Sequence, residues 1–160
     1  MSQQATVLTI ALDRPTRKGR AINVNEIMTG RPACCTASTK LTDAARMMVE
    51  NDCGAIPVVE NMQNKDPVGV ITDRDIVCRA VALGKDPAKV TVGECMSANV
   101  ITVTPETDVN ECARRMEAHQ LRRVLVTDRN HHLCGIVAQA DVARNAGKEK
   151  TAEVVQGVSA

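Results

Sequence analysis

Gly69-Val-Ile-Thr-Asp-Arg-Asp75 is the stretch that decides the fold, because a weaker copy, Gly135-Ile-Val-Ala-Gln-Ala-Asp141, lies near the other end of the 160-residue chain. In each copy an aliphatic run leads into a turn that opens a helical pattern. Thr72 and Asp75 have the spacing of a capping box, in which both side chains bind backbone N–H groups at a helix start. They can also hold a ribose, since an ionised carboxylate accepts hydrogen bonds from two neighbouring hydroxyls. Both interpretations stay open at this point.

The two copies belong to a longer internal repeat. Shifting the chain by 68 positions places residues 24–60 on residues 92–128 without a gap. The register then slips by two, because 61–68 is two residues longer than 129–134, as a hairpin loop allows. The chain is therefore predicted to contain two equivalent units. Nine positions are identical: Val24/Val92, Glu26/Glu94, Met28/Met96, Thr36/Thr104, Thr39/Thr107, Ala45/Ala113, Arg46/Arg114, Met48/Met116 and Val58/Val126.

Each unit is predicted to have the order β-α-β-β-α after a short helical turn. Apolar residues at three- and four-residue spacing predict amphipathic helices over 39–51 and 107–119, with Thr39 and Thr107 as N-caps. Such units leave an apolar sheet face uncovered, so the two should pack together by pseudo-two-fold symmetry into one α/β (α+β) body. The other predicted elements are turns at 24–28 and 92–96, strands at 33–36, 55–59, 67–71, 100–103, 124–126 and 133–137, and helices beginning at Asp73 and Gln139.

Composition excludes several classes of function. Charged residues make up 24% of the chain and the formal net charge is +1, so no overall charge attracts nucleic acid or membranes. The chain lacks Phe, Tyr and Trp, which removes the aromatic platforms that bind single-stranded nucleic acid. No stretch approaches 18 apolar residues and the N-terminus does not resemble a signal peptide. We therefore expect a cytoplasmic protein without a membrane or nucleic-acid partner.

The cysteine and histidine patterns predict neither a metal site nor an enzyme. Seven cysteines, an odd number without a CxxC pair, are expected to be reduced core residues. His131, His132 and Cys134 fall in a predicted hairpin loop without a fourth ligand at a recognised spacing. His119 is the remaining histidine, and none of the three has a Ser or Cys partner in a catalytic pattern.

Taken together, the element order, the Val-x-x-x-Met-(Thr/Ser) openings, Ile56-Pro-Val-Val59 and the 69–75 stretch resemble a tandem pair of CBS domains, the Bateman module. The resemblance covers about residues 22–147, and no catalytic domain is attached, as in stand-alone bacterial or archaeal members. It implies a regulatory module that binds AMP, ADP, ATP or S-adenosylmethionine between its repeats, with no obligatory cofactor. The expected divisions are a lead-in at 1–21, repeats at 22–85 and 86–147, and a C-terminal tail at 148–160.

The resemblance also implies which residues hold the sugar. In the family's G-h-x-T-x-x-D motif the Asp binds both ribose hydroxyls and the Thr helps to hold the sugar or phosphate, which places these roles on Asp75 and Thr72. In the second repeat Asp141 remains, but Ala138 replaces the hydroxyl residue. The first repeat is therefore expected to bind the ligand better.

Arg122 and Arg123 are implied to hold the phosphate. They stand just before the central strand of the second repeat, where the first repeat has Gly54-Ala55, and some family members have basic residues there that reach across to the opposing repeat. The arginine fork pairs well with phosphate oxygens, although a solvated pair at a strand start is the alternative. Without aromatic residues, adenine must lie between aliphatic groups. The expected walls of the first site are Ala33, Cys34, Ile56, Pro57 and Ile71.

Two functions follow from this sequence. The first is a sensor, in which the ligand changes the geometry of the repeats and thereby acts on a protein partner that the sequence does not identify. The alternative is a structural or dimerisation module with vestigial, unliganded clefts, which Ala138 favours. In both cases a homodimer is expected to bury apolar helix faces, such as those that carry Met47, Met48 and Met116.

Overall fold

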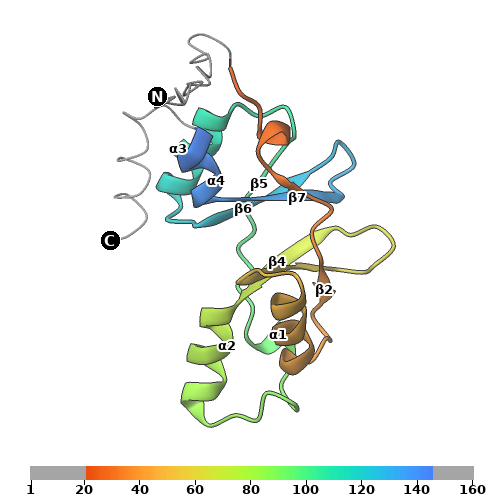
Figure 1. Ribbon diagram of the computed structural model, residues 1–160. Coiled ribbons are helices and arrows are strands. Elements are labelled where there is room, and N and C mark those ends of the chain that lie inside the picture. The colour runs from red at the N-terminus through yellow and green to blue at the C-terminus, as the bar shows by residue number, and fades with distance from the viewer. Residues whose placement is uncertain (1–20, 146–160) are drawn as a thin grey trace, which may run out of the picture.

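The computed structural model describes residues 21–145, so most of the predicted lead-in and the whole predicted tail at 148–160 lie outside the described residues. Two sheets form the centre of the molecule (Figure 1). The first has the strand order β2 (Cys35–Thr36), β3 (Ala55–Val59) and β4 (Pro67–Thr72). The second has the order β1 (Thr29–Gly30), β7 (Leu133–Ala138), β6 (Arg123–Thr127) and β5 (Thr102–Val103).

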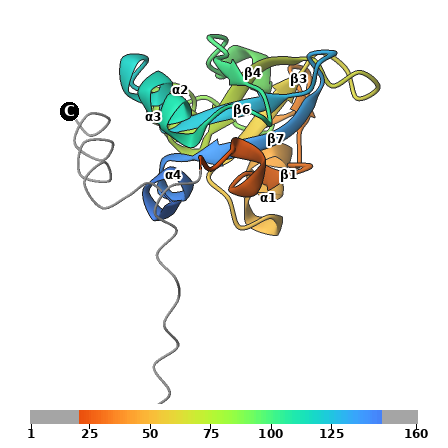
Figure 2. The same ribbon diagram turned by 90° about the horizontal axis from the view of Figure 1, so that it is seen from above.

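Helices cover the outer face of each sheet, so the molecule has four layers (Figure 1). The first sheet carries α1 (Leu41–Glu50) and α2 (Asp73–Arg79), and the second carries α3 (Val109–Ala118) and α4 (Gln139–Asn145). Seen from above, β6 and β7 overlie β3 and β4 (Figure 2). The predicted mixed α/β fold and its repeated element order are confirmed.

The two repeats share details of strand pairing. The short strands β2 and β5 are parallel to the central strands β3 and β6, respectively. The hairpin strands β3 and β4 are antiparallel, as are β6 and β7. The register shifts between Val58 and Val59 in β3, and between Val126 and Thr127 in β6. The irregularity thus recurs at the same place in the sequence repeat.

The opening segment of each repeat packs into the other repeat. Val24, in the 3-10 helix η1 (Val24–Glu26), is buried in the core of the second repeat, and its N–H donates to the carbonyl of Thr107 (2.9 Å). Val92, in η3 (Val92–Glu94), is buried in the core of the first repeat, and its N–H donates to the carbonyl of Thr39 (2.8 Å). Figure 1 shows the exchange, with the red-orange opening beside β7. Because each opening supplies core to the other unit, the repeats form one body.

The predicted N-caps Thr39 and Thr107 are wrong. The Thr107 hydroxyl accepts from the N–H of Thr104 (3.1 Å) and so belongs to the preceding turn, while Asp108 caps α3 by accepting from the N–H of its residue N2 (2.8 Å). In the first repeat Lys40 occupies the N-cap position of α1, without a side-chain cap. Each threonine lies one residue before the observed N-cap, and its hydroxyl accepts a hydrogen bond within the preceding turn.

Three apolar clusters form the interior. One lies within each repeat, and the third lies between the sheets, where Cys34 and Val59 meet Leu125 and Leu133. Aliphatic and thiol side chains fill this space without any aromatic residue. The sheets are therefore joined by an apolar contact as well as by the exchanged openings.

The expectation that the cysteines fill the core holds for only part of the set. Cys53 and Cys78 are exposed, because they lie in the loop after α1 and on the outer side of α2. Burial raises the pKa of Cys35 to about 11 and has the same effect on Cys112. These two thiols are therefore protonated and unreactive at neutral pH. The buried cysteines are Cys34, Cys35, Cys95 and Cys112.

We expect Gly69→Ala to destabilise the fold, because the opening of the second repeat presses against this glycine. A Cβ on Gly69 would lie 2.8 Å from Sδ of Met96 and 2.9 Å from the carbonyl oxygen of Ser97. Overpacking of this kind costs about 1–3 kcal/mol. Urea unfolding followed by far-UV circular dichroism measures the change. Gly30→Ala is the control, since nothing lies within 4 Å of the point that its Cβ would occupy; equal midpoints for the two variants would contradict the prediction.

Candidate functional site

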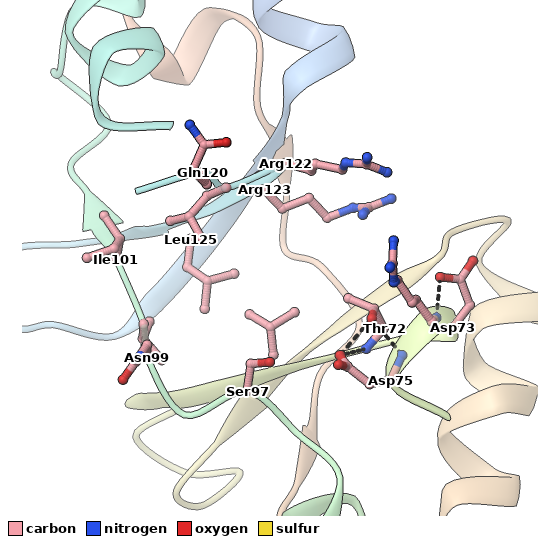
Figure 3. A pocket seen from close by; sticks show the side chains of 14 residues that line it. Thr72, Asp73, Asp75, Ser97, Asn99, Ile101, Gln120, Arg122, Arg123 and Leu125 are labelled. Carbon is pink, nitrogen blue, oxygen red and sulfur yellow. Dashed lines mark hydrogen bonds between the residues drawn. The ribbon is translucent and has the colours of Figure 1, made fainter. Parts of the chain in front are cut away.

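A cavity of about 400 Å³ lies between the two repeats, where β4 passes into α2 and opposite the start of β6 (Figure 3). Thr72 is the last residue of β4 and Asp75 lies in the first turn of α2. Arg123, from the other repeat, is the first residue of β6, and Arg122 directly precedes it. All four line this cavity. The fold thus brings together the residues that were predicted to hold the sugar and the phosphate.

The capping interpretation of the Thr72 and Asp75 pair is confirmed. The Asp75 N–H donates to Oγ1 of Thr72 (3.1 Å), and the Thr72 N–H donates to Oδ2 of Asp75 (3.0 Å). The Thr72 hydroxyl also donates to the same Oδ2 (2.6 Å), and Nη1 of Arg79 lies 3.3 Å from Oδ1. These contacts fix the direction of a carboxylate whose side chain is only 13% exposed.

The cap leaves Asp75 able to bind a ligand. A carboxylate offers about four acceptor positions, and three are occupied by the two Thr72 donors and Arg79. One position remains on Oδ1, and rotation of the Thr72 hydroxyl toward a ligand would release another. A single Thr-x-x-Asp turn can therefore cap a helix and accept hydrogen bonds from a sugar.

Positive charge predominates around the first cavity. Arg74, Arg122 and Arg123 line it together with the carboxylates of Asp73 and Asp75. Figure 3 shows the side chains of Arg122 and Arg123 extending from β6 toward the side of the cavity where α2 begins. Three guanidinium groups against two carboxylates favour a ligand with an anionic group at this end.

The walls of the first cavity differ from those expected. Ile56 and Ile71 are buried in the core of the first repeat and line neither cavity, and Cys34 and Pro57 are also buried without lining either. Successive side chains of a strand point to opposite faces, so Thr72 places Val70 on the cavity side and Ile71 in the core. The aliphatic wall consists of Val70, Val100, Ile101, Leu121 and Leu125.

A second cavity of about 380 Å³ occupies the equivalent place in the other half of the molecule. Asp141 lines it and accepts from the N–H of Ala138 through Oδ2 (2.9 Å), while Nη1 of Arg144 lies 3.3 Å from Oδ1. Without a hydroxyl at position 138, Asp141 lacks the extra donor that Asp75 receives from Thr72. Ala33, which was expected in the first site, lines this second cavity instead, because the opening segment of each repeat packs against the other repeat.

The structure adds lining residues that the motifs did not reveal. Asp52 in the second cavity and Gln120 in the first are equivalent in the repeat, and both have left-handed backbone conformations, with φ of 47° and 53°. Both conformations end the preceding helix, because the N–H of Cys53 donates to the carbonyl of Met48 (3.0 Å) and the N–H of Leu121 donates to the carbonyl of Met116 (2.8 Å). Arg31, with φ of 50°, lines the second cavity where Asn99 lines the first. The repeat alignment pairs these positions, but only the fold shows that they face cavities.

Two negative findings apply to residues 21–145. Within this range, no group of three His, Cys, Asp or Glu side chains is placed to hold a metal ion. The helices described there are all too short or too polar to cross a membrane.

The sequence matches the family model described as CBS domain twice, at residues 24–81 and 92–148. The chain belongs to the CBS domain family. Hypoxic response protein 1 of Mycobacterium tuberculosis, a relative, is 35% identical over 133 residues, which are 83% of this chain and 91% of the relative. The two cavities described above therefore lie in a tandem CBS pair, as the resemblance predicted.

Two solved structures are similar to this chain in fold. The CBS domain pair of protein MJ0100, in complex with 5′-methylthioadenosine and S-adenosyl-L-methionine, matches with a TM-score of 0.71 and 27% identity, over 82% of this chain and 100% of that chain. CBSX2 in complex with AMP matches with a TM-score of 0.66 and 28% identity, over 80% of this chain and 98% of that chain. Both of these similar CBS proteins are complexes with adenosine compounds.

Proposed function

We propose that this CBS pair is a regulatory module that binds a phosphorylated adenosine compound in the first cavity. The observation that carries the proposal is that Thr72 and Asp75 of one repeat face Arg122 and Arg123 of the other across one cavity of about 400 Å³. This volume lies in the range of small-molecule sites. The adenosine complexes of MJ0100 and CBSX2 support the class of ligand.

Each part of a nucleotide has a counterpart in the first cavity. The ribose hydroxyls donate to Asp75, and the phosphate lies against Arg122 and Arg123. The base packs between aliphatic side chains such as Val70 and Leu125. This assignment puts the three chemical groups on residues of both repeats, so the ligand bridges them.

The proposed signal is a change in the relative placement of the two repeats, which the ligand contacts at the same time. A ligand shifts a conformational equilibrium only if it binds one arrangement more tightly than the other. The contacts to Asp75 and to Arg122 can be made together in one relative placement of the repeats, so binding favours that placement. A protein partner that recognises it would then respond to the ligand.

Calorimetric titration of the purified chain with AMP, ADP, ATP, S-adenosylmethionine and adenosine tests the proposal. We expect a phosphorylated compound to bind more tightly than adenosine, because only it can pair with the arginines. The chain has no Trp or Tyr, so an absorbance band at 260 nm in the purified sample would also report bound nucleotide. If no adenosine compound binds, the proposed function is wrong.

The second candidate function is a dimerisation module. Met48 and Met116, expected on the dimer face, are buried in the two cores and are unavailable for it. Other apolar side chains are exposed on the first repeat, among them Val49 at 82% and Leu83 at 66%. We infer a homodimer that covers part of this surface. A chain that has a dimer mass in light scattering and binds no adenosine compound would favour this function over the sensor.

A further inference from the structure

Among the described residues, Arg123 alone lines both cavities. Its Nη2 lies 3.5 Å from the point that a Cβ on Gly54 would occupy, and Gly54 lines the second cavity. Oδ2 of Asp73, a residue of the first cavity, lies 2.9 Å from the same point. The guanidinium group therefore stands at the boundary between the two cavities, beside Gly54 and Asp73.

The repeat places the phosphate ends of both cavities at this boundary. Arg122 and Arg123, at the phosphate end of the first cavity, are equivalent to Gly54 and Ala55, which line the second. The second cavity therefore has no arginine of its own at the equivalent positions. An anionic group bound there would meet Arg123, reaching in from the other repeat.

We propose that Arg123 couples the two cavities, so that a phosphorylated adenosine ligand in the first cavity weakens binding of the same ligand in the second. The inference rests on the proposed function, because it requires an anionic ligand at the arginines. One guanidinium group that pairs with a phosphate in the first cavity is no longer fully available to a phosphate in the second.

The remaining charges decide which cavity retains the arginine. Without Arg123, the first cavity still has two arginines, one of them Arg122, against two carboxylates. The second cavity would have Arg31 alone against Asp52 and Asp141. Loss of Arg123 thus leaves the second cavity with an excess of negative charge. Sharing of Arg123 therefore weakens the binding of an anionic ligand in the second cavity, whereas the binding of an uncharged ligand is unaffected.

Titrations of variants with one functional cavity test the coupling. Asp141→Ala leaves only the first cavity and Asp75→Ala only the second, and together they give the affinity of each cavity for AMP alone. In the unmodified chain we expect the second AMP to bind about 5-fold or more weakly than it binds Asp75→Ala. With adenosine in place of AMP, the affinities from the two variants should reproduce the titration of the unmodified chain.

Arg123→Gln and Arg122→Gln form a matched pair for this test. Arg123→Gln, placed in the unmodified chain and in both single-cavity variants, should make the two AMP sites independent. Arg122 lines only the first cavity, so Arg122→Gln should weaken the first site and leave the coupling in place. If Arg123→Gln does not fold by circular dichroism, Arg123→Lys replaces it, since lysine retains the charge but lacks the planar fork. Reduced coupling is then expected.

Three outcomes would overturn the inference. Independent AMP sites in the unmodified chain would show that the cavities are not coupled, although the proposed function would stand. Coupling that persists unchanged in Arg123→Gln, or in Arg123→Lys where that variant replaces it, would assign it to another residue. Absence of binding by every adenosine compound in every variant would instead remove the proposed function and the inference together.

Discussion

Asp75→Ala is expected to lower the affinity of the first cavity for AMP by about 100-fold or more. Two ribose hydroxyls that donate to one ionised carboxylate make charge-assisted hydrogen bonds, each worth about 1.5–3 kcal/mol. The change removes both acceptors at once. Calorimetry in an Asp141→Ala background measures the effect on the first cavity alone, because the second lacks its own carboxylate there.

Two further variants separate ligand binding from helix capping. Asp75 also accepts from the N–H of Thr72, so its removal costs about 1 kcal/mol of stability through the cap. Asp75→Asn retains an oxygen for that N–H but loses the charge, and should weaken AMP binding with a smaller effect on urea unfolding. Asp43→Ala is the control, since it removes a half-exposed carboxylate from α1, away from both cavities. AMP affinity that is unchanged in Asp75→Ala would contradict the assignment of the ribose to this residue.

The double variant Arg122→Gln/Arg123→Gln is expected to lower AMP affinity by about 100-fold while leaving adenosine affinity nearly unchanged. Two charge-assisted contacts to a phosphate account for this magnitude, and adenosine has no phosphate to lose them. The ratio of the two affinities, measured by calorimetry with Asp141→Ala present, reports phosphate recognition separately from base and ribose recognition. The ratio should also fall as salt is added to the parent protein, because the arginines are partly exposed to solvent.

Arg46→Gln is the matched control for the arginine variants. Arg46 lies on α1 with a side chain 67% exposed, and it pairs with Asp43 rather than lining a cavity. Its loss changes the net charge of the chain without changing the site. Equal weakening of AMP and adenosine in the double arginine variant would mean that the arginines shape the cavity instead of binding phosphate.

The fold was largely predictable from the internal repeat, because two segments that share one pattern of apolar and turn residues are expected to form the same order of helices and strands. Strand 55–59 was predicted with its observed limits, and α2 begins at Asp73 as expected. The helix starts were less accurate, since Thr39 and Thr107 are suitable N-cap residues whose hydroxyls bind within the preceding turn. Residue type alone does not distinguish these two uses of a threonine.

The candidate site was partly predictable for a similar reason. Thr72 and Asp75 are close in sequence, so a local motif indicated them. Arg122 became a candidate only through the family resemblance, and its approach to Asp75 depends on how the repeats pack. The prediction that Ile56 and Ile71 line the first cavity was wrong, because it considered their hydrophobicity but not the alternation of side chains along a strand. The ribose and phosphate roles themselves stay predictions.

The sequence by itself determined the two repeats, the Thr72 and Asp75 turn and the loss of its hydroxyl at Ala138, because spacing and residue type are local properties. Only the tertiary structure decided that the openings exchange between repeats and that the two cavities meet at Arg123. Both depend on packing between segments far apart in the chain. Gly69 to Asp75 specifies a cap and the carboxylate of Asp75, whereas the packing of the second repeat against it supplies Arg122 and Arg123, which would make it a nucleotide site.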